Sequence, residues 1–163
     1  MKVREQQNRW DELCRDPSLG DLPYKTETNR RGQLILTPAS VSRSMGMSSV
    51  MQALDGCLFR GKSYPSFAIA TPEGVKVPDV AWASDGRLAE MKETGDPTTL
   101  APEISIEVTS KFNDWEEMEE KISLYREAGA EEVWVVDEEG DVRFFADEEL
   151  EESRLAEGFP SEL

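Results

Sequence analysis

The chain of 163 residues has no histidine and only two cysteines, Cys14 and Cys57. Without histidine, a Ser-His-Asp or Cys-His nucleophile system and any zinc site with histidine ligands are excluded. The two cysteines stand far apart in the sequence and cannot form a structural zinc site by themselves. The side chains left for catalysis are carboxylates, lysine and tyrosine, together with any metal ion that they bind.

The chain also lacks an apolar run of the roughly 20 residues needed to cross a membrane. Its first residues lack the apolar segment of a signal peptide. With two unpaired thiols, this predicts a reduced, cytoplasmic protein that has no membrane partner. The length predicts one domain over residues 1–163 with one hydrophobic core, an N-terminal extension at 1–22 and an acidic C-terminal segment at 147–163. The composition of that last segment favours partial disorder, although Phe159 and Leu163 leave room for a final packed element.

Positive charge is scarce, with 18 Lys and Arg against 34 Asp and Glu, which gives a net charge of −16. Residues 1–76 carry 11 basic and 8 acidic side chains, net +3, and residues 77–163 carry the other 7 and 26, net −19. The second part would repel a phosphate backbone, so we expect nucleic acid to bind only through the first part, and weakly. The basic residues available there are Arg30, Arg31, Arg43, Arg60, Lys62 and Lys76. The alternative interpretation is an acidic surface that only promotes solubility.

Hydrophobic periodicity and turn signals predict alternating strands and helices. We expect a short helix within 1–16, a helix from Ser42 or Ser44 to about 58, a helix at about 115–128, and strands at 33–37, 66–71, 75–82, 103–109, 133–136 and 142–146. The strand–helix–strand unit at 103–136 implies a crossover between parallel strands of one sheet. Hairpins at 66–82 and 133–146 add antiparallel pairs. The predicted fold class is therefore α/β or α+β, with a mixed sheet and flanking helices.

Two carboxylates and one lysine fall on apolar elements of this scheme. Asp79 follows Pro78 at the end of a predicted strand, and Glu107 lies in the apolar run 104–108, where an unpaired carboxylate costs several kcal/mol, by a rough estimate. Lys121 lies on the same helix face as Met118 and Tyr125, so it is directed toward the sheet. A divalent metal would explain all three, because Asp and Glu oxygens are the ligands that Mg²⁺ and Mn²⁺ prefer. Crowding of the carboxylates should raise the pKa of at least one of them.

Each of these residues also has a simpler interpretation. Asp79 could be a polar residue at a strand end. Lys121 could extend along the edge of the apolar stripe and pair with a surface glutamate. Lys111, in the loop after the strand that holds Glu107, is a second candidate for a catalytic lysine. If Lys121 is held in an apolar stripe, Lys121→Met should leave folding intact or improve it.

Several segments together resemble the Uma2 family, a group of predicted endonucleases in the PD-(D/E)XK superfamily. They are Pro78-Asp79-Val80, the stretch 102–110 around Glu107, the stretch 121–129 that begins with Lys121, and Trp134-Val135-Val136-Asp137. The resemblance runs from about residue 27 to residue 145. It implies a restriction-endonuclease-like core.

The resemblance also implies roles for individual residues. Asp79 and Glu107 would bind Mg²⁺ or Mn²⁺, the Val108 carbonyl could add a ligand, and Glu27 would complete the acidic cluster. The superfamily motif usually has a lysine two positions after the glutamate, where this chain has Thr109. In Uma2-like sequences the lysine comes from the following helix, which matches Lys121, and it would orient the attacking water and stabilise charge in the transition state.

The function expected from these features is Mg²⁺-dependent hydrolysis of phosphodiester bonds in DNA. Uma2 sequences often have a histidine after the first strand, where this chain has Ser42-Arg43-Ser44. A catalytically silent member of the same fold that acts as an acidic protein-interaction module is therefore an alternative, and a phosphohydrolase for small nucleotides is a third. Cutting both strands of a duplex usually needs two sites, so we expect a homodimer, with Trp10, Leu13, Met45 and Met47 as candidate contacts.

Overall fold

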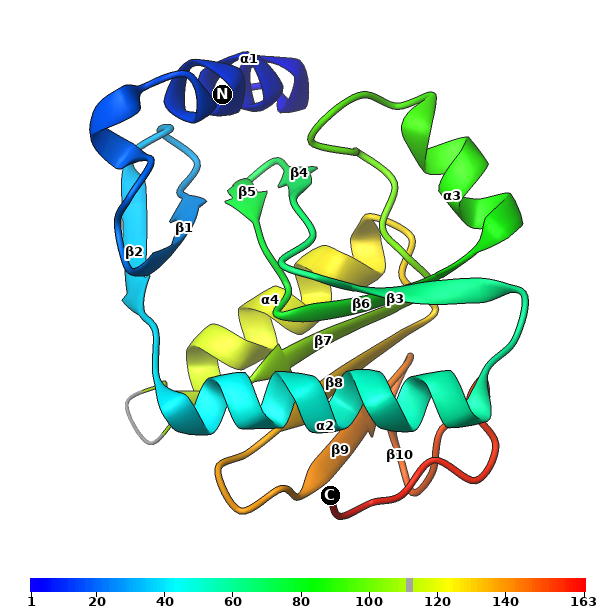
Figure 1. Ribbon diagram of the computed structural model, residues 1–163. Helices are drawn as coiled ribbons and strands as arrows, with labels where there is room; N and C mark the ends of the chain where they lie inside the picture. The colour runs from blue at the N-terminus through cyan, green and yellow to red at the C-terminus, as the bar shows by residue number, and fades with distance from the viewer. Residues whose placement is uncertain (111–112) are drawn as a thin grey trace.

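A six-stranded mixed sheet lies at the centre of the computed structural model, which describes residues 1–110 and 113–163 (Figure 1). The strand order is β10-β9-β8-β7-β6-β3. The bounds are β3 Gly61–Pro65, β6 Val80–Ser84, β7 Ile104–Val108, β8 Glu132–Val136, β9 Val142–Phe145 and β10 Glu149–Leu150. Strands β7 and β8 are parallel and the other neighbours are antiparallel. Helix α4, Trp115–Glu127, connects the parallel pair, which confirms the predicted strand–helix–strand unit.

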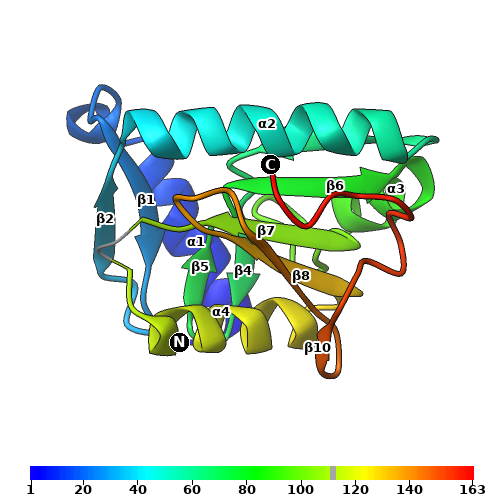
Figure 2. The same cartoon turned by 90° about the horizontal axis from the view of Figure 1, so that it is seen from below.

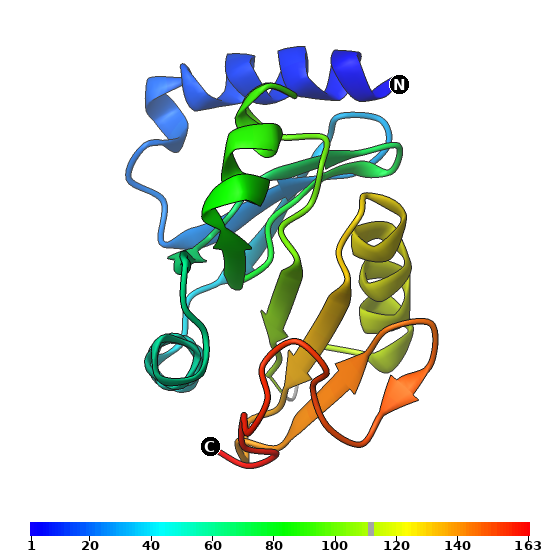
Figure 3. The same ribbon diagram turned by 90° about the vertical axis from the view of Figure 1, so that its right-hand side faces the viewer.

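Helices cover both faces of the sheet, as Figures 2 and 3 show: α2, Val41–Cys57, lies on one face and α4 on the other. Side chains alternate along β7 because successive residues of a strand point to opposite faces. Ile104 and Ile106 join the larger apolar cluster with Val50 and Leu54 of α2. Glu107 therefore points to the opposite face, toward α4. The alternation of side chains along β7 therefore places the larger apolar cluster on one face of the sheet and the Glu107 carboxylate on the other.

The caps of the two long helices fix where they begin. Ser40 accepts a hydrogen bond from the backbone N–H of Arg43, so α2 begins earlier than the predicted start at Ser42 or Ser44. Asp114 caps α4 by accepting from the N–H of Glu117 at 2.8 Å. Gly129, at φ +107, follows α4 in a conformation that favours glycine.

Within residues 1–110 and 113–163, no helix is both long and apolar enough to cross a membrane.

Several strands differ from the sequence prediction. The predicted strand 75–82 divides into β5, Gly74–Lys76, and β6, because Pro78 has no N–H to donate to a sheet. Strand β5 pairs with β4, Ile69–Thr71, in a separate two-stranded sheet. Strands β1, Tyr24–Thr28, and β3 were not predicted, because both are polar and only partly buried. Strand β1 pairs with β2, Leu34–Pro38, in a third sheet.

The N-terminal helix α1, Val3–Cys14, holds the β1–β2 hairpin in place. Gln6 donates its side-chain amide to the Arg30 carbonyl at 3.0 Å, and Arg9 donates to the Gly32 carbonyl at 3.1 Å. A short helix, η1 at Pro17–Leu19, follows, and Figure 1 shows α1 lying across the end of the hairpin. Helix α3, Asp85–Lys92, lies beyond β6 at the other side of the molecule. Strand β1 is thus anchored from outside the central sheet.

The expectation of disorder at 147–163 is wrong, because this segment packs against the sheet. Phe159 is 6% exposed and its ring centroid lies 4.5 Å from that of Trp134. The buried Glu132 carboxylate accepts hydrogen bonds from the Ser153 hydroxyl and from the backbone N–H groups of Arg154 and Leu155. An acidic composition did not reveal these contacts, because the acidic side chains point outward and the few apolar ones point in.

We therefore predict that Phe159→Ala will lower the free energy of unfolding by about 3–5 kcal/mol, the usual cost of removing a buried aromatic ring. Urea denaturation followed by Trp fluorescence would measure this change. Leu163→Ala is the control, since Leu163 is 37% exposed and should cost far less. Equal effects of the two substitutions would show that the segment does not contribute to the core.

Candidate metal and catalytic site

Asp79 and Glu107 meet because their strands are antiparallel neighbours. Val80 of β6 pairs with Ile106 of β7, which places the preceding Asp79 beside the following Glu107. Both carboxylates are 3% exposed. Asp79 Oδ2 accepts a hydrogen bond from the Val108 N–H at 2.8 Å, which fixes its carboxylate against the end of β7.

Helix α4 supplies two donors to the face of the sheet on which Glu107 lies. Lys121 and Tyr125 are four residues apart, about one helical turn, so both side chains point toward the sheet. The Tyr125 hydroxyl donates to Glu107 Oε1 at 2.6 Å, and Lys121 Nζ lies 3.2 Å from the same oxygen. Lys121 is 6% exposed, so its ammonium is directed into the cluster, as the apolar stripe predicted.

Glu27 reaches the cluster from the β1–β2 hairpin. Its Oε1 atom accepts from the Val77 N–H at 2.7 Å and from Lys121 Nζ at 3.1 Å. Val77 lies at the interruption between β5 and β6, where its N–H is available to a side chain instead of a strand. The hairpin is therefore connected to the central sheet through one carboxylate that also binds the lysine of α4.

Lys25 is a member of the cluster that sequence reasoning missed. Its Nζ atom lies 2.9 Å from Glu107 Oε2, 3.2 Å from Asp79 Oδ1 and 3.8 Å from Glu27 Oε1. The one signal for it in the sequence was its position two residues before Glu27, because alternate residues of a strand share a face. That signal depended on recognising β1 as a strand. Tyr125 was recognised only as an apolar position.

The two central carboxylates have opposite pKa shifts. Burial, and then repulsion by Glu107, raise the pKa of Asp79 to about 6. Burial also raises the pKa of Glu107, but Lys121 and Lys25 outweigh that effect and lower it to about 2. One carboxylate pKa is raised, as predicted, but burial contributes more to the shift than the crowding by Glu107 that the prediction named. Burial lowers the pKa of Lys121, but Glu107 and Glu27 outweigh it and raise the pKa above its usual value, so the lysine remains charged.

Two residues predicted to act at the site, Arg43 and Val108, are hydrogen-bonded to each other. The Val108 carbonyl accepts a hydrogen bond from Arg43 Nε at 3.3 Å. Arg43 also donates to the Pro38 carbonyl at 3.5 Å and is 8% exposed. Its guanidinium therefore lies inside the protein instead of on the surface expected of a phosphate contact. Lys111, the second candidate lysine, lies outside the described residues.

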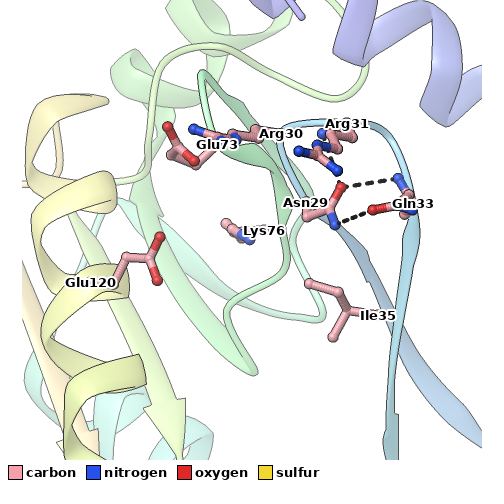
Figure 4. Close-up of a pocket in the computed structure, with 8 residues that line it drawn as sticks. All are labelled: Asn29, Arg30, Arg31, Gln33, Ile35, Glu73, Lys76 and Glu120. Carbon is pink, nitrogen blue, oxygen red and sulfur yellow. Dashed lines mark hydrogen bonds between the residues drawn. The ribbon is translucent and has the colours of Figure 1, made fainter.

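The remaining predicted cations lie in two places. Arg30 and Arg31 line a pocket of about 330 Å³ with Lys76 and with Glu73 and Glu120, as Figure 4 shows. The Asn29 side chain holds the turn of this hairpin: its amide donates to Gln33 Oε1 at 2.9 Å, and its Oδ1 accepts from the backbone N–H of Gln33 at 3.1 Å.

Lys76, at the base of the pocket, donates to the Thr28 carbonyl at 3.1 Å, and burial lowers its pKa. Arg60 and Lys62 lie at the start of β3, away from Asp79, because Pro65 at the end of β3 pairs with Val80. Apart from Arg43, the predicted cations thus fall into one group that lines this pocket and another at the start of β3.

The carboxylate oxygens of this cluster are the type of donor that a divalent cation binds. Within residues 1–110 and 113–163, no three Asp, Glu or Cys side chains are arranged to hold a metal ion as they stand. An ammonium, Lys25 Nζ, lies between Asp79 Oδ1 and Glu107 Oε2 and contacts both. These two oxygens therefore share one cation position, and oxygen donors are the ones that Mg²⁺ and Mn²⁺ take.

Comparison with family models gives a match to Uma2, described as "Putative restriction endonuclease", over residues 24–161. The chain belongs to the Uma2 family. The match covers β1, Asp79, β7 and α4, so every element of the cluster lies inside it. A comparison with curated proteins found no match.

One solved structure supports the fold. A putative nuclease belonging to DUF820 from Anabaena variabilis ATCC 29413 aligns with a TM-score of 0.60 and 17% identity, over 74% of this chain and 71% of that chain. A DrdV–DNA complex aligns at a TM-score of 0.44 and 10% identity, over 91% of this chain and 12% of that chain. The first likeness and the family match establish a restriction-endonuclease-like fold with a mixed sheet and flanking helices.

The raised pKa of Asp79 predicts a pH dependence of stability in the absence of metal. The folded Asp79 binds its proton more tightly than the unfolded one, so this contribution is complete below about pH 4 and is lost as the pH rises through about 6. Between pH 5 and 7 in EDTA, the free energy of unfolding should fall by about 1–3 kcal/mol from this group. Urea titrations at several pH values would measure it.

Asp79→Asn is the control for this measurement, because it removes the titrating group and should flatten the curve between pH 5 and 7. Any slope that remains in Asp79→Asn belongs to the other carboxylates. An unchanged slope would contradict the assignment to Asp79.

Proposed function

We propose that this Uma2 protein is a Mg²⁺-dependent endonuclease that hydrolyses phosphodiester bonds in DNA. The observation that carries the proposal is the single cation position between Asp79 Oδ1 and Glu107 Oε2, beside the buried ammonium of Lys121. Two carboxylates at one cation position and an adjacent lysine are the groups that metal-assisted phosphodiester hydrolysis requires.

Asp79 and Glu107 would hold the metal, with Glu27 as the third carboxylate of the cluster. A bound Mg²⁺ would supply Lewis-acid stabilisation of the phosphate charge and lower the pKa of a bound water. The Val108 carbonyl is a candidate further ligand, and it would need to exchange its hydrogen bond with Arg43 for the metal. Asp79 and Glu107 are therefore the defining pair of ligands in this proposal.

Lys121 is the residue we propose for stabilising charge on the reacting phosphate. Glu27 and Glu107 hold its ammonium at 3.1 and 3.2 Å, so its position is set before substrate binds. The same contacts change the expected effect of Lys121→Met on folding. Because Lys121 is paired with two buried carboxylates, its removal should destabilise the protein, opposite to the expectation from an apolar stripe.

DNA is the substrate that we propose, bound through the first part of the chain. Arg30 and Arg31 lie at the turn three residues beyond Glu27 and line the pocket in Figure 4. Both arginines are exposed at the surface. Glu73 and Glu120 line the same pocket, so the local positive charge is small and binding should be weak. Arg60 and Lys62 lie at the end of β3 away from Asp79, so DNA bound at the cluster would have to extend along β3 to contact them.

We also propose a homodimer, because one site cuts one strand. Of the four apolar residues predicted at the contact, Leu13 is buried and Met47 packs on the core, while Met45 is 65% exposed. The apolar residues Leu34, Ile35 and Leu36 of β2 are a stronger candidate contact, since all are more than a third exposed and β2 has one partner strand within the described residues.

Cys14 and Cys57 are free thiols, which suits the cytoplasmic location that we propose.

A catalytically silent protein-interaction module is the second candidate function. One observation favours it: Lys25 already fills the cation position, so the carboxylates have a partner without metal. The acidic charge of residues 77–163 would then serve a basic protein partner. Metal binding separates the two candidates.

The metal proposal predicts that the wild-type protein binds Mn²⁺ and that Asp79→Asn/Glu107→Gln does not. Isothermal titration calorimetry on EDTA-treated protein measures this, and cleavage of plasmid DNA with Mg²⁺ measures activity. We expect binding and cleavage to be lost together in the double variant. Unchanged Mn²⁺ binding in the double variant would remove the assignment of these ligands.

Lys121→Met is the matched variant for the same experiment. Lys121 is not a ligand in this proposal, so Lys121→Met should still bind Mn²⁺ but should lose cleavage by about a hundredfold or more. Circular dichroism would establish that the variant is folded. Full cleavage by folded Lys121→Met would show that another residue, with Lys111 as the first candidate, has this role.

The DNA proposal predicts that Arg30→Ala/Arg31→Ala weakens duplex binding by about tenfold and reduces the salt dependence. Fluorescence anisotropy with a labelled duplex measures this, with Ca²⁺ in place of Mg²⁺ to block cleavage. The starting Kd should be no tighter than roughly 10⁻⁴ to 10⁻⁶ M near physiological salt. Arg60→Ala/Lys62→Ala removes the same charge and is the control. Equal losses in both pairs would show that only net charge matters.

A further inference from the structure

Lys25 has no role in the function proposed above, yet it makes the closest ionic contact to the cation position. Its ammonium contacts Asp79 and Glu107, the same two carboxylates that the metal would need, at 3.2 and 2.9 Å. An ammonium and a divalent ion cannot both occupy that position. Lys25 must therefore either replace the metal permanently or leave when the metal binds.

Charge balance favours exchange over permanent replacement. Among the groups in direct ionic contact, the three carboxylates of Glu27, Asp79 and Glu107 face the two ammonium groups of Lys25 and Lys121, which leaves one negative charge when all are ionised. The buried Lys76 and Arg43 act on Glu27 and Asp79 from outside these ion pairs. If a divalent cation takes the position of Lys25 while Lys121 stays, the directly paired groups become neutral. A buried cluster is most stable without excess charge, so the divalent ion is the better partner for these carboxylates.

The two lysines also differ in how firmly they are held. Lys121 projects from the middle of α4, and its side chain is 7% exposed. Lys25 projects from the outer end of β1, beside the 42% exposed Tyr24, and its side chain is 12% exposed. A lysine side chain has four rotatable carbons, so the ammonium of Lys25 can move toward solvent without a change in the strand.

We propose that Lys25 is an internal competitor for the divalent cation: its ammonium holds the carboxylates of Asp79 and Glu107 together in the metal-free protein and is displaced when the metal binds. This inference rests on the proposed metal site. Lys25 is a positioning residue in the metal-free state. Because the metal must displace its ammonium, the wild-type protein binds metal more weakly than it would without this lysine. The carboxylates remain assembled without metal because Lys25 offsets their repulsion.

The test is calorimetric titration of EDTA-treated, full-length protein with Mn²⁺, comparing wild type with Lys25→Met. Removing the competitor should tighten Mn²⁺ binding by about tenfold or more, because the metal no longer has to break the contacts of the ammonium. Lys25→Arg keeps the charge and should bind no more tightly than wild type. Adding Asp79→Asn to Lys25→Met should abolish the gain, since the gain requires the same ligand.

Lys76→Met is the matched control for charge alone. Lys76 is buried near Glu27, but its ammonium donates to the Thr28 carbonyl instead of a carboxylate. Its removal deletes the same charge without opening the cation position, so Mn²⁺ affinity should change much less than in Lys25→Met. Equal tightening in both variants would overturn the competitor proposal and leave a general charge effect.

Thermal unfolding gives a second readout that does not depend on activity. In EDTA, Lys25→Met should unfold at a lower temperature than wild type, because three buried carboxylates lose a partner. Saturating Mn²⁺ should raise the unfolding temperature more in Lys25→Met than in wild type. If Lys25→Met is unfolded in EDTA, refolding on addition of Mn²⁺, followed by circular dichroism, supports the proposal in the same way.

The failures of the two proposals are distinguishable. If wild type and Lys25→Met bind Mn²⁺ with affinities within about twofold of each other, the competitor proposal is overturned and the metal site remains. If neither protein binds Mn²⁺, the metal site itself fails and the competitor proposal falls with it. Weaker binding in folded Lys25→Met would also overturn the competitor proposal, since it would make Lys25 a support of the metal site.

Discussion

The burial of Glu107 in the middle of the sheet is the constraint on which the rest of the site depends. A carboxylate inside a strand has no water to solvate it, so its charge must be balanced by neighbours. Tyr125 and Lys121 of α4 and Lys25 of β1 provide that balance, and they come from a helix that covers the sheet and from a separate hairpin. The position of α4 and of the β1–β2 hairpin is therefore tied to one side chain of β7, in addition to the apolar contacts that pack them.

This arrangement also explains why the N-terminal hairpin belongs to the functional part of the molecule. Among the residues that the structure describes, it pairs with no strand of the central sheet, yet Lys25 and Glu27 both reach the cluster. Helix α1 holds the turn of the hairpin through Gln6 and Arg9, and Val77 fixes Glu27 through its backbone N–H. Rigid support of this kind is what a preorganised electrostatic site needs, because a carboxylate that can move also loses its effect on neighbouring charges.

Opposite pKa shifts in Asp79 and Glu107 follow from which lysines each of them contacts. Burial raises the pKa of both carboxylates, but Glu107 contacts Lys25 and Lys121 and is stabilised as a charged group. Asp79 contacts only Lys25 among the lysines that the structure describes, and it faces the charge of Glu107. Two carboxylates at one site thus have different proton affinities, as is common where a cation is to be bound or a proton moved. The ammonium of Lys25 is shared by the two carboxylates.

The sequence by itself predicted most of the longer elements and the convergence of Asp79, Glu107 and Lys121. The apolar run around Glu107, the helical stripe around Lys121 and the polar break at Asp79 predicted a mixed sheet and a shared cation position, because these patterns are local in the chain. Only the tertiary structure decided the role of Lys25, the engagement of Arg43 with Val108, and the packing of Phe159. Each of these depends on a contact between residues distant in sequence, or on a polar strand such as β1 with no periodic apolar signal. Partner choice at a buried charge is set by which elements converge in space, and no spacing within the chain encodes that convergence.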